Sequence, residues 1–410
     1  MRYLKALGLD DFKAKILSGH NAMMEGERVR VAKARGRVLA SAIRSPINVP
    51  HFRRAMRDGY AVRARDTFGA SEENPLIFDL VEEVPAGKIP LKKVGEHQCT
   101  YVATGSMIPE NADGVVMIEF TEAEDSKIKI KQAITPETFV IPVGKDIREG
   151  EEIFPAGTVL TSLKLGVLAA IGLEDVWVYR KTRVGVMSTG NEIIPLGSPL
   201  QEGKIFDINS MTLSSRLEDI GVVVTLYGII PDDEWQLVKI LKETLQTQDI
   251  IILSGGTSKG REDLMPRILE IAPDVDLILH GARIKPGKPI LYARWHQKPV
   301  FVLPGYPASC LMTYLLFVEP LILQMNHYPP KEDKIIEARL STRVYSELGK
   351  LEFKTVKVEY DKEIDALRAY PIEKGSESIT TLANADGYFI IKEMQTIVEE
   401  GQVVKVHLFQ

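Results

Sequence analysis

The stretch Ile250-Ile251-Ile252-Leu253-Ser254-Gly255-Gly256-Thr257-Ser258-Lys259-Gly260 decides the fold, because an apolar run passes directly into a glycine-rich turn. Helix-period segments follow most turns of this kind, and that alternation is typical of a parallel sheet covered by helices on both faces. Ligands of such sheets bind beyond the carboxyl ends of the strands. We therefore expect a doubly wound α/β domain over residues 176–327, with its site at the turns. Three more runs end this way: residues 184–187 before Ser188-Thr189-Gly190-Asn191-Glu192, 222–227 before Pro231-Asp232-Asp233, and 300–303 before Pro304-Gly305-Tyr306-Pro307.

The segments between these turns have the period of amphipathic helices. An apolar run, Ala308–Val318, ends at Glu319-Pro320. It is shorter than the roughly 20 residues that a bilayer requires, so it predicts a buried helix. Three other helices are expected: residues 209–220 capped by Asn209 or Ser210 and ended by Gly221, residues 232–246 begun by Asp232 or Asp233, and residues 264–271.

The sequence on either side of the α/β domain changes character. Short β-type runs between turns predict a β-rich domain over residues 46–140. Residues 1–45 are expected to be mostly helical, and a helix is expected over Leu163–Ile171, ended by Gly172 in a left-handed conformation. Beyond Pro329-Pro330, apolar and charged residues alternate, which predicts a C-terminal β domain with one solvent-facing side.

The length and composition limit the number of domains and the classes of partner that are expected. A chain of 410 residues is too long for one compact core, and 45% hydrophobic with 26% charged residues is ordinary for a globular protein. A net charge of −5 argues against a nucleic-acid partner. Cys99 and Cys310 lie far apart and predict buried free thiols. The N-terminus lacks the apolar core of a signal peptide, so we expect a cytoplasmic protein without membrane attachment.

The turn at 254–260 suits an anion, because three glycines let several backbone N–H groups converge and a helix follows. The turn lacks the Gly-Lys-Ser/Thr ending of a Walker A loop. A plain tight turn explains the glycines equally well. A second anion-binding candidate is Ile284-Lys285-Pro286-Gly287-Lys288-Pro289, which places two ammonium groups near the same turns, with Arg283 adjacent. A solvated surface turn is an equally simple explanation of that loop.

Five acids follow the strands: Glu192, Asp207, Asp232, Asp233 and Asp263. Carboxylates that converge beside an anion site suit Mg²⁺, which prefers oxygen ligands and often bridges to substrate phosphates. A simpler explanation is that Asp232 and Asp263 only cap helices. No Cys/His spacing indicates zinc, and no Ser-His-Asp or Cys-His arrangement can be nominated. The residues alone therefore indicate a phosphoanhydride substrate with metal assistance.

Six motifs in order resemble the MoeA/gephyrin family of molybdopterin molybdenumtransferases, from about residue 5 to the C-terminus. They are Asp58-Gly59-Tyr60-Ala61-Val62, Thr104-Gly105-Ser106 through Ala112-Asp113-Gly114-Val115-Val116, Ser188-Thr189-Gly190-Asn191-Glu192, Ser254-Gly255-Gly256 with Asp263, Lys285-Pro286-Gly287-Lys288-Pro289, and Leu303-Pro304-Gly305-Tyr306-Pro307-Ala308-Ser309.

The resemblance implies a homodimer of four-domain subunits. The domains would be a discontinuous N-terminal helical and dimerisation domain (1–45 and 141–175), a β-rich insertion (46–140), a MogA-like α/β domain that binds molybdopterin (176–327), and a C-terminal β-barrel (328–410). It also implies an enzyme that inserts molybdenum from molybdate into adenylylated molybdopterin and releases AMP with Mg²⁺. A molybdopterin adenylyltransferase and molybdoenzyme acceptors would be its partners.

Roles follow from the resemblance residue by residue. Asp58 and Thr104 would come from one subunit, and Glu192, Asp232, Asp263 and Lys285 from the other, as catalytic residues. The residues that would bind metal are Asp263, Asp232 and Glu192. The residues that would bind substrate or phosphate are Ser254, Gly255, Gly256, Lys288, Pro304, Gly305 and Pro307.

The sequence departs from the family pattern in three places. Ala55-Met56-Arg57 replaces Ser-Ala-Met before Asp58, so a hydroxyl is lost and a cation gained. Tyr306 replaces Asn, and Gly281 stands where some members carry Lys, for which Arg283 is a substitute. These changes leave open whether molybdate or tungstate is handled. The same motifs are also compatible with a MogA-like adenylyltransferase and with a non-catalytic, gephyrin-like scaffold.

Overall fold

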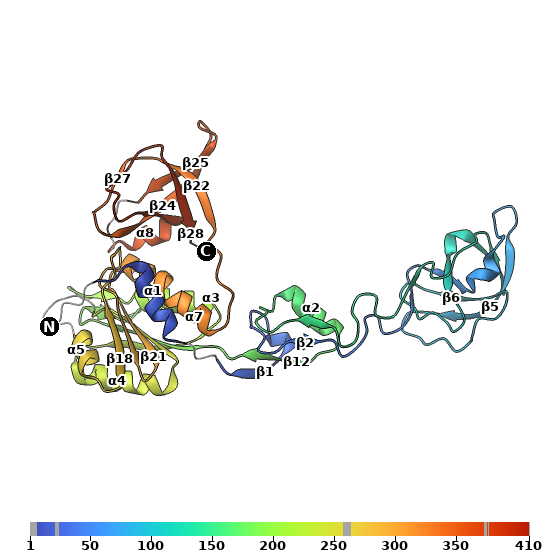
Figure 1. The fold of residues 1–410 in the computed structure, drawn as a ribbon, viewed down its shortest axis with the longest axis horizontal. Coiled ribbons are helices and arrows are strands. Elements are labelled where there is room, and N and C mark those ends of the chain that lie inside the picture. Colours follow the sequence, from blue (N-terminus) through green and yellow to red (C-terminus); the bar gives the residue numbers. More distant parts are fainter. Residues whose placement is uncertain (1–5, 21–23, 257–263, 373–374, 376, 410) are drawn as a thin grey trace. The chain divides into compact units, whose positions relative to one another are not determined.

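The computed structural model describes residues 6–20, 24–256, 264–372, 375 and 377–409. The chain divides into two compact units (Figure 1). Met1–Glu27, Gly36–Val38 and Val178–Gln410 form the first, which we call the α/β–barrel unit. Arg28–Arg35 and Leu39–Trp177 form the second, the β-rich unit. Each unit has its own core.

A six-stranded sheet organises the α/β–barrel unit, in the order β16-β13-β17-β21-β20-β18. Four neighbouring strands are parallel, so their carboxyl ends lie at one edge, which we call the carboxyl edge. The last two run antiparallel, so the sheet is mixed. The expected placement of all four turns at one edge is confirmed. The strands are β13 (Arg183–Thr189), β16 (Val223–Ile230), β17 (Ile250–Ser254), β18 (Val275–His280), β20 (Leu291–Trp295) and β21 (Lys298–Leu303).

Helices cover both faces of this sheet, as the alternating burial of β17 requires. Ile250 and Ile252 pack in one core with α3, whereas Ile251 and Leu253 pack in another with α4 and α5. A strand buried on both sides reads as an unbroken apolar run, and this is why 250–253 has no polar residue. The doubly wound expectation is confirmed. The helices are α3 (Asn209–Asp219), α4 (Glu234–Thr247) and α5 (Leu264–Ile271).

The apolar run after β21 forms the core helix of the unit, in the segments α6 (Pro307–Thr313), η4 (Tyr314–Val318) and α7 (Glu319–Met325). The expected buried helix is confirmed, and it continues past Glu319-Pro320, where the apolar run ends. The η4 segment is a π-helix, and its wider turn relieves the missing N–H and the ring clash of Pro320. By length and composition this 19-residue helix passes for a membrane span, but 72% of the apolar window is buried inside the protein. Phe12 of α1 (Leu9–Ser18) packs on Phe317 with ring centroids 4.8 Å apart.

The C-terminal strands close into a barrel, because β24 pairs with both β25 and β26. The ring continues from β25 through β22 and β28 back to β26. This confirms the C-terminal barrel. Its members are β22 (Ile335–Leu340), β24 (Leu351–Asp361), β25 (Ala366–Pro371), β26 (Gly387–Ile391) and β28 (Val403–Leu408), with α8 (Ile379–Asn384) before β26. Short pairs elsewhere in the unit are β14 (Ile193–Ile194) with β15 (Ile205–Phe206), and β23 (Val344–Tyr345) with β27 (Ile397–Val398).

The β-rich unit contains a second six-stranded sheet, β7-β4-β6-β5-β9-β8. Tyr60 and Val62 of β4 face one core while Ala61 faces another, so this sheet is also covered on both sides. Cys99 is buried and free, as is Cys310 in the other unit. The strands are β4 (Gly59–Val62), β5 (Leu76–Val84), β6 (Gln98–Val102), β7 (Gly114–Met117), β8 (Thr121–Glu124) and β9 (Lys127–Ile130).

Residues before the β-rich sheet are less helical than expected. Within the described part of residues 1–45, α1 is the one α-helix, and residues 26–30 form a strand because Val29 and Val31 alternate with arginines. The helix expected at 163–171 is α2 (Ser162–Ala170), capped by Thr161 and followed by Gly172 at φ 77°. The remaining elements here are β1 (Gly26–Arg30), β2 (Ile43–Arg44), β3 (Arg54–Ala55), β10 (Val140–Ile141), β11 (Glu152–Phe154), β12 (Asp175–Tyr179), and 3-10 turns at 31–33, 64–67 and 118–120.

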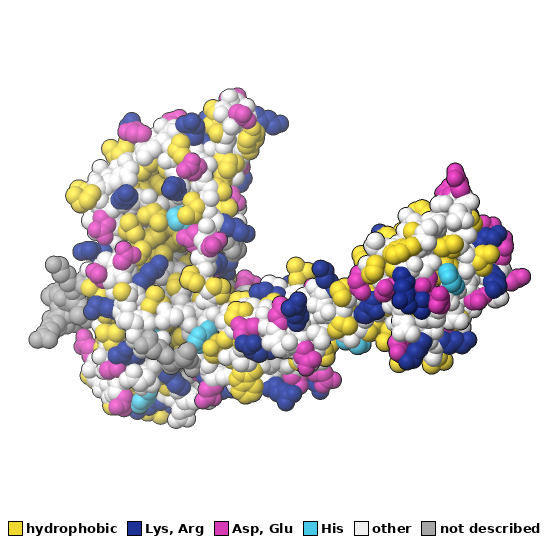
Figure 2. Space-filling model, turned by 45° about the vertical axis from the view of Figure 1, so that its right-hand side comes forward, with side chains coloured by type: hydrophobic (Ala, Val, Ile, Leu, Met, Phe, Trp, Pro, Cys, Tyr) yellow, Lys and Arg dark blue, Asp and Glu magenta, His cyan; other side chains and the backbone are white. Residues whose placement is uncertain are grey.

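Charged side chains of both signs are interspersed over the face drawn in Figure 2. This distribution agrees with the small net charge of −5. Mixed surfaces of this kind are ordinary for a globular protein.

Candidate active site

Two exposed carboxylates lie against the loop that follows β13. Thr189 Oγ1 donates to Asp232 Oδ1 at 2.6 Å, and the backbone N–H of Asn191 donates to Asp232 Oδ2 at 3.3 Å. Glu192 folds back over Gly190, where an added Cβ would lie 2.8 Å from Glu192 Oε2. The structure therefore brings Asp232 and Glu192, which the sequence placed after different strands, to one loop at the carboxyl edge.

Two other predicted acids have structural roles. Asp207 Oδ1 accepts from Ser188 Oγ at 2.9 Å and from the N–H of Ser210 at 3.1 Å, so Asp207 caps α3 rather than Asn209 or Ser210. Asp233 Oδ1 accepts from the N–H of Gln236 at 2.8 Å, which caps α4. Side chains of successive strand residues point to opposite faces, so Asp207 and Asp232, bonded to Ser188 and Thr189, lie on opposite sides of the sheet. The five acids therefore do not all converge; Asp263 lies outside the described residues.

The glycine-rich turn is held tightly at its start. Gly255 has φ 102°, donates to the carbonyl of Leu303 at 2.9 Å, and leaves no room for a side chain because a Cβ would lie 2.3 Å from the carbonyl oxygen of Thr189. The described part of the turn ends at Gly256. The glycine at 255 is thus required by the close approach of the β13 end.

Asn209 makes contacts at the carboxyl edge that sequence reasoning missed. Its buried Nδ2 donates to Ser254 Oγ at 2.6 Å and to the carbonyl of Gly305 at 2.8 Å. One amide therefore ties the glycine-rich turn to the turn after β21, and an added Cβ at Gly305 would lie 3.8 Å from the Gly255 Cα. In the sequence Asn209 indicates a helix start, because Asn is a good N-cap residue, and this explanation hid its contacts with the two turns.

The turn after β21 offers backbone rather than side chains. Pro304 is buried, Gly305 is exposed, and Pro307 begins α6. Burial raises the pKa of the nearby Cys310 thiol to about 12, so this thiol is not a nucleophile near neutral pH. The Tyr306 side chain is 60% exposed. Its replacement of Asn therefore changes the outer surface of the turn.

The lysine loop is connected to the barrel. Ile284–Lys285 forms β19, which pairs with β24 of the barrel. Lys285 Nζ lies 3.3 Å from Glu347 Oε1 and 3.5 Å from the buried Glu352 Oε1. Lys350 and then Lys285 hold the pKa of Glu347 below its usual value. Lys288 is exposed, and its side chain has no ion pair within the described ranges.

Asp58 and Thr104 are bonded to each other in the β-rich unit. The backbone N–H and the Oγ1 of Thr104 donate to the same oxygen, Asp58 Oδ1, at 2.6 and 2.7 Å. These two bonds lower the pKa of Asp58, the backbone one contributing most. The pair is exposed, so an anionic carboxylate is presented to solvent near neutral pH.

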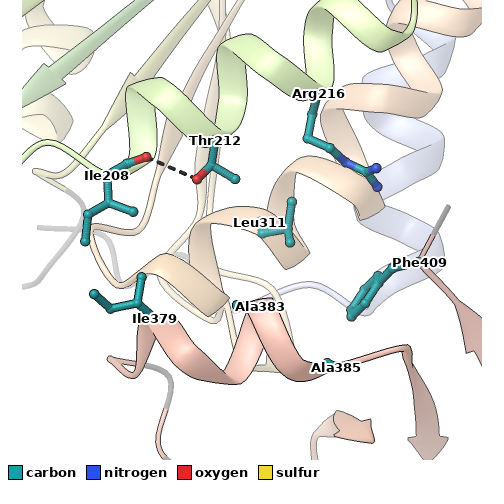
Figure 3. Close-up of a pocket in the computed structure, with 8 residues that line it drawn as sticks. All are labelled: Ile208, Thr212, Arg216, Leu311, Ile379, Ala383, Ala385 and Phe409. Carbon is teal, nitrogen blue, oxygen red and sulfur yellow. Dashed lines mark hydrogen bonds between the residues drawn. The ribbon is translucent and has the colours of Figure 1, made fainter. Parts of the chain in front are cut away.

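A cavity of about 380 Å³ lies elsewhere, between the N-terminal half of α3 and the barrel's α8 (Figure 3). Its lining is mostly apolar, and none of the predicted catalytic or substrate-binding residues contributes to it. The lining residues are Ile208, Thr212, Arg216, Leu311, Ile379, Ala383, Ala385 and Phe409. This cavity is therefore separate from the predicted site at the carboxyl edge.

The fold and the carboxyl edge together define a multidomain protein built around a doubly wound α/β domain with a candidate site at its strand ends. The family description of a probable molybdopterin binding domain matches residues 185–324. The MoeA N-terminal region (domain I and II) matches residues 7–172, and the MoeA C-terminal region (domain IV) matches residues 337–409. The chain belongs to the MoeA family, as its motifs predicted.

Known relatives match this sequence over nearly its whole length. A molybdopterin molybdenumtransferase of Haemophilus influenzae is 30% identical, with 98% of each chain covered. One of Bacillus subtilis is 31% identical, with 94% of this chain and 90% of the relative covered. The crystal structure of a molybdopterin biosynthesis MoeA protein from Pyrococcus horikosii has a TM-score of 0.87 at 36% identity, with 99% of this chain and 100% of that chain covered.

Proposed function

We propose that this chain inserts molybdenum from molybdate into adenylylated molybdopterin and releases AMP. The chain is a MoeA-type transferase of molybdenum cofactor biosynthesis. The observation that carries the detailed proposal is the pair of exposed carboxylates, Asp232 and Glu192, on one loop at the carboxyl edge. Ligands of open α/β sheets bind at this edge.

Asp232 is built to keep its orientation. A hydroxyl and a backbone N–H each hold one of its oxygens, and each oxygen retains a further lone pair for a ligand. An oriented carboxylate stabilises charge without reorganising during the reaction. Asp58 would act with it from a second subunit, its Oδ2 left free by the two bonds from Thr104.

Mg²⁺ suits these oxygen donors. Glu192 and Asp232 would hold the ion together with Asp263, which is outside the described residues. Among the described residues, no group of three His, Cys, Asp or Glu side chains is close enough to hold a metal ion by itself. The bound ion would supply Lewis-acid polarisation of a phosphoryl oxygen. The protein's own task here is to keep two carboxylates exposed and fixed.

Substrate anions would be met by the backbone and by lysines. The turn at Ser254, Gly255 and Gly256 would contribute N–H groups, and Lys288 an unpaired ammonium group. Lys285 would contribute a second, after exchanging its contacts with Glu347 and Glu352 for the substrate. The backbone of Pro304, Gly305 and Pro307 would complete the surface beside the glycine-rich turn.

The proposal also includes the oligomeric state, the cellular location and the partner enzymes of the protein. A homodimer would bring Asp58 and Thr104 of one subunit to the carboxyl edge of the other. The protein would work in the cytoplasm, between a molybdopterin adenylyltransferase that supplies its substrate and molybdoenzymes that accept its product.

The test is AMP release by the purified protein with adenylylated molybdopterin, Mg²⁺ and molybdate. We expect AMP only when both Mg²⁺ and molybdate are present, and Asp263→Ala should abolish it. A scaffold would leave AMP unreleased with or without the substitution. An adenylyltransferase would instead release pyrophosphate from ATP and molybdopterin. Replacing molybdate by tungstate compares the two oxyanions directly.

A further inference from the structure

The residues just before Asp58 are fixed between two neighbouring backbones. The N–H of Ala55 donates to the carbonyl of Ser106, and the N–H of Gly105 donates to the carbonyl of Ala55, both at 2.9 Å. On the other side β3 pairs with β10. Ala55 is buried, and strand alternation sends the side chain of Arg54 to the opposite, exposed side. Arg54 and the Asp58–Thr104 pair are therefore held by the same backbone frame.

Three arginines in this segment differ in their partners. Arg53 is structural, because its Nη1 donates to the carbonyl of Ala112 at 3.0 Å and its Nη2 to Glu137 at 2.8 Å. Arg54 and Arg57 are exposed, and neither side chain has an ion pair or hydrogen bond to any part of the chain that the structure describes. Arg57 directly precedes Asp58. Two guanidinium groups without a partner in the described ranges thus belong to the same short backbone segment, 54–58, as this carboxylate.

The negative charge of Asp58 gives the two arginines a possible role in binding an anion. Asp58 is anionic near neutral pH, so it repels an anion that approaches its free oxygen. Arginine beside it offsets the repulsion and presents a planar set of donors that matches two oxygens of one phosphate-like group. Lysine or a neutral residue lacks that paired geometry.

We propose that Arg54 and Arg57 bind a tetrahedral oxyanion of the substrate and position it against Asp58. This inference rests on the proposed function and adds to it two substrate-binding residues of the β-rich unit. The shared chemistry is a negatively charged tetrahedral oxyanion. It has two sources in the reaction, the phosphate of the adenylate and molybdate itself.

The experiment titrates the full-length protein with AMP alone and with sodium molybdate alone by calorimetry. The variants are Arg57→Gln, Arg57→Lys and Arg54→Gln. The matched control is Arg148→Gln, an exposed arginine of the same unit that also makes no ion pair within the described ranges. Thermal unfolding of each variant checks that the fold is kept.

Arg57→Gln should weaken binding of at least one anion about tenfold at low salt, with Arg57→Lys intermediate because one ammonium replaces two parallel donors. The loss should shrink at high salt, since both groups are exposed. Arg148→Gln should stay within about twofold of the unaltered protein, because Arg148 is not part of the 54–58 segment. Weaker AMP binding assigns the adenylate phosphate, and weaker molybdate binding assigns the metal oxyanion.

Equal binding of both anions by Arg57→Gln, Arg54→Gln and Arg148→Gln would overturn the inference, as would an unaltered protein that binds neither anion. The proposed function fails separately. A protein whose anion binding depends on Arg57, yet which releases no AMP from adenylylated molybdopterin, keeps this inference and loses the transfer activity. A protein that releases AMP equally well in all variants keeps the transfer activity and loses this inference.

Discussion

Asp232 and Asp58 lie in different units, and each is held by one hydroxyl and one backbone N–H. The two arrangements differ in which oxygens are used. Asp232 receives one bond on each oxygen, whereas Asp58 receives both bonds on Oδ1. Two tethered oxygens fix the plane of the carboxylate, while a single tethered oxygen lets the other swing about it. From this difference we expect Asp232, the rigid carboxylate of this comparison, to keep its orientation better than Asp58, the pivoting carboxylate.

The largest effect should come from removing the charge of the rigid carboxylate. Asp232→Asn keeps the shape of the side chain and an acceptor for Thr189 but loses the negative charge and one acceptor oxygen. Removing one preorganised electrostatic group typically costs about 100- to 1,000-fold in rate. We expect AMP release from adenylylated molybdopterin to fall by about this factor, measured under single-turnover conditions.

The neighbouring aspartate provides the control. Asp233→Asn alters the helix cap on Gln236 and should lower the free energy of unfolding by less than about 1 kcal/mol, because Asn is also a good cap. AMP release should be nearly unchanged. Similar rate losses in both variants would show that the charge of this region, and not the orientation of Asp232, matters.

The second test concerns how the carboxyl edge stays rigid. Asn209→Leu leaves the buried Ser254 Oγ and the Gly305 carbonyl without their donor, at a cost of about 1–3 kcal/mol in stability. Chemical denaturation should show this loss, together with slower AMP release. In a double-mutant cycle with Ser254→Ala, the combined loss should be smaller than the sum of the two single losses. Additive losses would mean that Asn209 does not couple to the turn.

Sequence periodicity located most of the fold. The four apolar runs predicted the parallel strands, and the helix expected at 264–271 coincides with α5. The π-helix through Tyr314–Val318 was not predicted, because tertiary burial lets the core helix continue past Pro320 where local rules end it. The strand at 26–30 was missed because short alternating segments carry little signal.

The site was predicted unevenly for a physical reason. Strand ends are visible in sequence, so the positions of Glu192 and Asp232 followed from the pattern. Side-chain partners from distant segments are not visible, and Asp58 with Thr104 came from family resemblance alone. The same limit hid the partners of Lys285, which come from the barrel. It also concealed which aspartate of Asp232-Asp233 caps α4.

The third prediction concerns Lys285, whose ammonium group is already paired in the structure. Glu347→Gln removes one of its two carboxylate contacts and should tighten molybdate binding about three- to tenfold at low salt. The control is Glu399→Gln, which removes the same charge from an exposed pair with Arg343. Equal increases in molybdate affinity in both variants would mean that only the net charge of the protein matters. Calorimetric titration at two salt concentrations separates these outcomes.

The smallest effect should come from the pivoting carboxylate. Thr104→Val removes the Oγ1 donor but keeps the backbone N–H, so the pKa of Asp58 should rise part of the way toward its ordinary value. Because the folded pKa is depressed, the stability linked to Asp58 is present above the unfolded pKa and is lost as pH falls through the folded one. In Thr104→Val the stability linked to Asp58 should be smaller, and its loss should be complete at a higher pH. A carboxyl ¹³C NMR titration measures the shift, and Thr104→Ser, which keeps a hydroxyl, should titrate like the unaltered protein. An unchanged pKa of Asp58 in Thr104→Val would mean that the backbone N–H of Thr104 alone orients Asp58. Asp58 would then depend on one donor, whereas Asp232 has two.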